Sequence, residues 1–107
     1  MLITNVETVP NKVILKHFGL VYGSTIRAKH IGRDFAAGIK NIFGGELRGY
    51  TELLTESRAE AVKRMMQQAH SMGANAIVNV RFSTSSVAQG AAEILVYGTA
   101  VMVGEHG

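Results

Sequence analysis

The sequence predicts an α+β domain in which an antiparallel sheet is covered by one long helix. Stretches rich in β-branched and aromatic residues, which favour strands, occur before residue 27 and after residue 74. Between them, apolar residues recur at helical spacing, most regularly over residues 51–72. Strands at both ends of the chain with helices between them are typical of an α+β fold whose sheet is largely antiparallel.

The length of 107 residues corresponds to one domain, residues 1–107, large enough to bury a core without covalent cross-links. The chain has no cysteine, which excludes disulfides, thiolate metal ligands and cysteine nucleophiles. The first ten residues lack the basic and apolar regions of a secretory signal, and no apolar run is long enough to span a membrane. We therefore expect a cytoplasmic protein that does not insert into a membrane.

The first quarter of the chain is expected to form strands. Residues 2–9 alternate weakly and stop at Pro10-Asn11, a turn signal, which predicts a short strand. Residues 13–26 predict one long bent strand or two short ones. Gly19 and Gly23 lie inside this stretch, where glycine marks a bulge or the close approach of another backbone.

A short helix is predicted over residues 31–43. Its apolar residues recur at intervals of four, four and three: Ile31, Phe35, Ile39 and Ile42. Gly44-Gly45 is expected to end it. Glycines lower helix stability by roughly 1 kcal/mol each where they lie inside the helix. Packing against other parts of the protein must therefore hold this element.

The long helix is predicted from its start, its apolar face and its end. Thr51 or Thr55 is expected to supply the N-cap oxygen. Glu60 and Arg64 have the spacing of an i,i+4 ion pair. Gly73 suits the C′ position because it enters the left-handed region without a Cβ penalty. The apolar stripe consists of Leu54, Ala61, Met65, Ala69 and Met72, broadened by Val62 and Met66.

Two more strands are predicted after the helix. Residues 75–84 alternate, with Ile77 as the exception, and one face is expected to hold Ala76, Val78, Val80 and Phe82. Residues 92–103 are apolar on nearly both faces. Leu20–Ser24 and Leu95–Thr99 share the letters LVYG followed by a hydroxyl residue. We hypothesise that these two strands are neighbours in the sheet, and chance recurrence is the alternative.

The apolar surplus predicts self-association. One helix covers one face of a small sheet, whereas the last predicted strand is apolar on both, and the mean hydropathy is +0.15. A soluble monomer rarely exposes contiguous apolar patches beyond a few hundred Å². We therefore expect a symmetric homo-oligomer. The alternative is docking of the basic stretch Lys29–Lys40 on a membrane surface, which its glycines and Asp34 disfavour.

Composition and motifs argue against several functional classes. The net charge is +3, but the basic residues are dispersed and no stacking array accompanies them, so no nucleic-acid partner is expected. His17, His30, His70 and His106 lack the spacing of a metal site. No P-loop, GxSxG or SxxK motif is present. These observations favour a protein without catalytic activity.

The strongest candidate for a ligand site is a set of polar residues in the middle of the chain: Arg27, Arg33, Asp34, Glu46 and Tyr50. Such a set suits a cleft between subunits that binds an anion or another small ligand. A salt-bridge network that fixes the oligomer is the alternative, because charge clusters are more often structural.

Several segments together resemble the YbjQ-like family of small prokaryotic proteins. They are ETVP, GRDFAAGIKNIFGGELRGYTELL, ESRAEAVKRM, GANAIVNVRF and AEILVYGTAV, and the likeness runs from Ile3 to Val103. The resemblance implies a dodecin-like subunit with a helix over an antiparallel sheet. It also implies a homopentamer with extra short strands at the interfaces.

The family carries a heavy-metal-binding label without an agreed activity, and the resemblance brings no catalytic residues to this chain. A soft heavy metal prefers thiolate ligands, which this sequence does not contain. The leading hypothesis is therefore a non-enzymatic pentamer that binds a small ligand or metal ion at subunit interfaces or in a central channel. A small interface-active hydrolase or isomerase and a purely structural, partner-binding ring are the alternatives.

Overall fold

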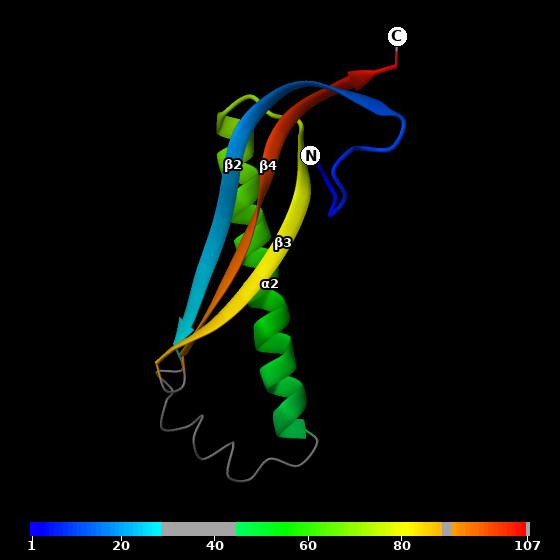
Figure 1. Cartoon of the computed structure of the whole chain (residues 1–107). Coiled ribbons are helices and arrows are strands. Elements are labelled where there is room, and N and C mark those ends of the chain that lie inside the picture. The colour runs from blue at the N-terminus through cyan, green and yellow to red at the C-terminus, as the bar shows by residue number, and fades with distance from the viewer. Residues whose placement is uncertain (29–44, 89–90, 107) are drawn as a thin grey trace.

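A computed structural model describes residues 1–28, 45–88 and 91–106. Within these residues one helix, α2 (Gly45–Ser71), packs against a four-stranded sheet (Figure 1). The strands are β1 (Leu2–Ile3), β2 (Lys12–Ala28), β3 (Ala76–Ala88) and β4 (Ala91–Glu105). This architecture confirms the α+β prediction. The short helix predicted at residues 31–43 lies outside the described residues.

The sheet is mixed rather than antiparallel, with strand order β1-β3-β4-β2. β4 is antiparallel to both β2 and β3, but β1 runs parallel to β3, with Leu2 opposite Ala76. The strand predicted over residues 2–9 is only two residues long, because the chain bends at residues 5–8. The predicted Pro10-Asn11 turn is present, with a Lys12 N to Val9 O hydrogen bond of 3.1 Å and a positive φ at Asn11.

The second strand region is one long bent strand, which was one of the two predicted alternatives. Its pairing with β4 shifts register between Ile14 and Lys16 and again between His17 and Gly19. Gly19 has a φ of 113°, a conformation that glycine adopts without a steric penalty. The two shifts mark bulges, which bend a strand. The start of β2 curves over the end of the sheet in Figure 1.

The long helix begins six residues earlier than predicted, so Thr51 and Thr55 lie inside it and neither is the N-cap. Gly49 does not end the helix, because one interior glycine costs about 1 kcal/mol and the neighbouring residues favour helix. The predicted stripe is confirmed by the full burial of Ala61, Met65 and Ala69. Half-buried residues of the stripe pack on the same core: Leu54, Val62, Met66 and Met72.

The helix ends as predicted at Gly73, which has a φ of 94°. Gly73 N donates to His70 O at 3.0 Å, and Ala74 N donates to Ala69 O at 3.1 Å. This pair of hydrogen bonds is the Schellman motif, which satisfies carbonyls that the end of a helix leaves free.

The predicted alternation of β3 is wrong beyond Val78. Ala76 and Val78 pack with Val9 and Val101 on the face away from α2, whereas Ile77 and Val80 join the core under α2. The reason is a bulge, visible as a register shift between Val78 and Arg81 and as a positive φ at Asn79. One extra residue moves every later side chain to the other face.

The hypothesis on the two LVYG segments is confirmed, because β2 and β4 are neighbours. Their segments pair symmetrically about Tyr22 and Tyr97, with Val21 opposite Gly98 and Gly23 opposite Val96. Each valine therefore packs towards α2 across from a glycine of the partner segment.

Candidate binding surface

The five candidate ligand residues come from three regions of the chain. Arg27 lies one residue before the end of β2, and Glu46 and Tyr50 lie in the first two turns of α2. The end of β2 and the start of α2 lie at the same end of the molecule in Figure 1. Arg33 and Asp34 lie outside the described residues. The grouping of these five residues stays a prediction.

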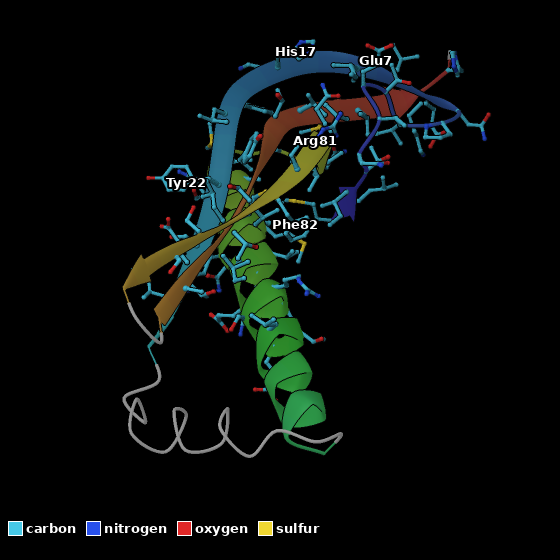
Figure 2. All side chains as sticks on the ribbon, turned by 60° about the horizontal axis from the view of Figure 1, so that its bottom comes forward. Glu7, His17, Tyr22, Arg81 and Phe82 are labelled. Atoms are coloured by element: carbon cyan, nitrogen blue, oxygen red, sulfur yellow. The ribbon has the colours of Figure 1, made fainter. Side chains whose placement is uncertain are left out.

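The face of the sheet opposite α2 carries a set of exposed apolar side chains, which we call the open face. On β2, Val21 and Thr25 point towards α2, so the even-numbered residues between Leu20 and Ile26 point away from it. The exposed fractions on this face are 66% for Leu20, 53% for Tyr22, 62% for Ile26 and 38% for Tyr97. Tyr22 and Tyr97 are direct cross-strand partners, and Figure 2 shows Tyr22 projecting outward from β2.

The other end of the same face is covered by the N-terminal segment. Val9 packs there with Ala76, Val78 and Val101, and all four side chains are buried. Ile14 and Val103 are half-buried against this second core. Within the described residues, the N-terminal segment covers one half of the sheet surface opposite α2. The open face is the other half, which neither α2 nor the N-terminal segment covers.

The outer edge of β2 is protected by side chains of α2. The Tyr22 backbone N–H donates to Gln68 Oε1 at 2.8 Å, and Arg64 Nη1 donates to the Ser24 carbonyl at 2.7 Å. Arg64 Nε also binds Glu60 Oε2 at 3.2 Å, which confirms the predicted i,i+4 pair. The helix lies over β2 so closely that these side chains occupy hydrogen-bonding groups another strand would need.

A groove of about 600 Å³ lies between the N-terminal segment and β3. It is lined by Ile3, Thr4, Asn5, Val80, Arg81 and Phe82. Arg81 Nη1 donates to Asn5 O at 2.8 Å and to Val80 O at 3.0 Å, which fixes the guanidinium beside the groove. Phe82 is half-exposed, and Figure 2 shows both side chains on β3. Sequence reasoning missed this groove, because the parallel contact of residues 2–6 with β3 has no local signal.

In the part of the chain that the structure describes, the donor atoms do not fit a heavy-metal site. No group of three or more His, Asp or Glu side chains gathers there, and the sequence holds no cysteine. A structural metal ion usually needs three or four converging protein ligands. No described helix is long and apolar enough to cross a membrane.

Comparison with known proteins gives the family. The family model described as "Putative heavy-metal-binding" (YbjQ) matches residues 1–104. The chain is 71% identical over 103 residues to a UPF0145 protein of Hahella chejuensis, covering 96% of this chain and 99% of that protein. It is 62% identical over 94 residues to a UPF0145 protein of Acinetobacter baylyi, covering 88% of this chain and 87% of that one.

The fold also resembles a solved structure. A protein of unknown function from Pediococcus pentosaceus, assigned to the DUF74 family, superposes with a TM-score of 0.60 at 14% sequence identity. The superposition covers 97% of this chain and 98% of that one. At this identity the likeness concerns the fold alone. The match of the family model along residues 1–104 and the identity to the UPF0145 proteins show that this chain is a member of the YbjQ family.

Proposed function

We propose that the protein is a non-enzymatic subunit of a homopentameric ring that binds a small ligand where its copies meet. The observation that carries this proposal is the open face, where Leu20, Tyr22, Ile26 and Tyr97 remain exposed in a single chain. Burying a large apolar side chain contributes about 1.5–3 kcal/mol. Covering this surface with other copies therefore supplies a substantial driving force for assembly.

The two sides of the sheet favour a ring over a two-fold dimer. The outer edge of β2 is occupied in its middle by Gln68 and Arg64, whereas β1, of two residues, is the one described strand on the outer side of β3. A contact between two unlike edges is head to tail, and such contacts form a ring where the rotation between copies closes. Five copies are the number that the family resemblance implies, and a cysteine-free chain suits the reducing cytoplasm.

The ligand is proposed to bind where a ring repeats single side chains around its axis. Arg27, Arg33, Asp34, Glu46 and Tyr50 are the residues that would line this site. Two of the five are arginines, whose planar guanidinium groups bind carboxylate and phosphate groups through paired hydrogen bonds. A metal ion, as the family description suggests, would need ligands from several copies, because the described part of one copy does not gather three.

The assembly is tested by placing a charge on the open face. We expect Tyr22→Lys to lower the assembled fraction by about tenfold or more, because a buried lysine without a partner is strongly disfavoured. Light scattering coupled to gel filtration measures the mass in solution. Ala59→Lys is the matched control, since Ala59 is exposed on α2 and away from the sheet. A Tyr22→Lys protein that assembles like the control would contradict the proposal.

A further inference from the structure

The groove beside β3 has the size of a small-molecule site, and both of its walls belong to one chain. Its volume is about 600 Å³, within the range of roughly 300–1,000 Å³ that is common for ligand pockets. Two hydrogen bonds hold the walls together, because Thr4 N donates to Ile77 O at 2.9 Å and Val80 N donates to Thr4 O at 3.0 Å. The groove therefore forms without a second copy.

Arg81 brings a positive charge to the groove that no acidic side chain neutralises within the described residues. The ion pairs in this part of the chain join Lys12 to Glu105 and Arg64 to Glu60. Arg81 is also the one charged residue among those that line the groove. An unpaired cation beside a groove attracts an anionic ligand.

The guanidinium group of Arg81 is held in one orientation, and the two nitrogens that suit a ligand are unused. Nη1 donates both of its hydrogens to backbone carbonyls, one to Asn5 O at 2.8 Å and one to Val80 O at 3.0 Å. No described residue accepts a hydrogen bond from Nε or Nη2. These two nitrogens form the fork that binds a carboxylate through two parallel hydrogen bonds. Because the group is already ordered, less conformational entropy is lost when a ligand binds.

Apolar side chains line the same groove as this cation. Phe82 is 50% exposed and Ile3 is 37% exposed, and both belong to the lining. A ligand that covers them gains free energy, since the transfer of apolar surface out of water is favourable. The groove therefore offers one fixed cation and an adjoining apolar surface, which complement an anion with an apolar body.

The single charge of the lining favours a carboxylate over a phosphate. A phosphate group carries a charge of about −1.5 to −2 at neutral pH, which one guanidinium group does not balance. A carboxylate carries one negative charge, and its two oxygens match the planar fork of an arginine.

We propose that this groove binds a small monocarboxylic acid with an aromatic or branched apolar body. The carboxylate pairs with Nε and Nη2 of Arg81, and the apolar body lies against Phe82 and Ile3. This site is separate from the ligand site proposed between copies, because it lies within a single chain and uses none of the residues proposed there.

The first test compares three probes on the wild-type protein. Phenylacetate has the carboxylate and the ring, phenylacetamide has a similar shape without the charge, and acetate lacks the ring. The methyl NMR signals of Ile3 and Val80 are followed during each titration. We expect phenylacetate to bind with a dissociation constant on the order of 1 mM, as is usual for ligands of this size, and about tenfold or more tightly than either other probe.

Two results of these titrations would overturn the carboxylate site. One is an equal affinity for phenylacetate and phenylacetamide, because the fork of Arg81 would then contribute nothing. The other is the absence of any shift in the Ile3 and Val80 signals at roughly ten times the expected dissociation constant.

The second test changes the cation. Arg81→Gln is expected to weaken phenylacetate binding by about tenfold or more and to leave the weak binding of phenylacetamide unchanged. A collapse of the groove would instead weaken both probes, and the titrations of the wild type would then decide. Arg58→Gln is the matched control, because Arg58 is exposed on α2 and its replacement removes the same charge. An Arg81→Gln protein that binds phenylacetate as tightly as this control would contradict the proposal.

The outcomes also separate this site from the proposed ring. A wild-type chain that is monomeric in light scattering and binds phenylacetate would keep the groove site and overturn the ring. A pentamer whose Ile3 and Val80 signals do not respond to phenylacetate would keep the ring and overturn the groove site.

Discussion

Gly23 sets the distance between α2 and the sheet. A Cβ atom at this position would lie 2.0 Å from the Ala61 carbonyl oxygen and 2.6 Å from the Met65 nitrogen. Both atoms belong to the backbone of the helix, so neither can move without moving α2. The same close approach lets Gln68 and Arg64 reach the edge of β2.

Replacing this glycine is expected to destabilise the fold. Gly23→Ala should lower the free energy of unfolding by about 1–3 kcal/mol or more, because the helix must shift away from a well-packed core. Urea denaturation at a fixed protein concentration measures the change. Ser24→Ala, whose side chain points to the opposite face, should stay within about 0.5 kcal/mol of the wild type. If the two variants were equally stable, α2 would pack less closely against Gly23 than these distances indicate.

The sequence predicted a bulge or a close backbone approach at Gly19 and Gly23. It did not indicate which of the two occurs at each position. Glycine inside a strand indicates a bulge or a close approach, and the structure has the bulge at Gly19 and the approach at Gly23. The burial of Ser57 was not predicted. It is fully buried on α2, and its carbonyl accepts a hydrogen bond from Thr25 Oγ1 at 3.1 Å. A serine does not contribute to hydrophobic periodicity, so the apolar pattern of the helix does not predict that it is buried.

At the level of elements, the off-centre position of α2 explains why the two edges of the sheet differ. The helix covers the β2 side and hydrogen-bonds its edge, while Phe82 on β3 remains half-exposed although it lies opposite the core residue Val96. An unprotected strand edge pairs readily with other chains. The side chains of Gln68 and Arg64 therefore act against uncontrolled pairing at β2.

Replacing Arg64 and Gln68 together tests whether their side chains protect the edge of β2. The double variant Arg64→Met and Gln68→Met frees the Tyr22 N–H and the Ser24 carbonyl, and each lost hydrogen bond costs about 0.5–1.5 kcal/mol. We expect larger and less uniform particles in dynamic light scattering over time. Glu60→Gln is the control, because it breaks the ion pair of Arg64 but leaves the hydrogen bonds from Gln68 and Arg64 to β2. A double variant that stays as uniform as this control would argue against edge protection.

Element boundaries depend on contacts that lie far apart in sequence. The stripe and the C-terminal cap of α2 were predictable, because helical spacing and a left-handed glycine are local signals. The bulge at Asn79 was not predictable from alternation, and it reverses the faces of Val80 and Phe82 relative to Val78. The two-residue β1 and its parallel pairing depend on the position of β3 rather than on residues 2–9 themselves.

At the scale of the whole molecule, one copy is elongated and incompletely covered. Its principal extents are 59 × 23 × 16 Å, and large apolar side chains remain exposed on both β2 and β4. The sequence predicted an apolar surplus on the last strand, but β2 carries most of the exposed apolar side chains, and Tyr97 is the one that the described part of β4 exposes. It did not indicate which half of the face is open, because the N-terminal segment that covers the other half is placed by its contacts with β3.

Native mass spectrometry on untagged protein purified without added metal tests whether the protein is a five-copy ring with a bound ligand. We expect a species of five times 11.5 kDa with additional mass, and elemental analysis then shows whether that mass is a metal ion. A pentamer without additional mass would contradict ligand binding and agree with the ring. A single-chain species at all accessible concentrations would contradict both the ring and the ligand site between its copies.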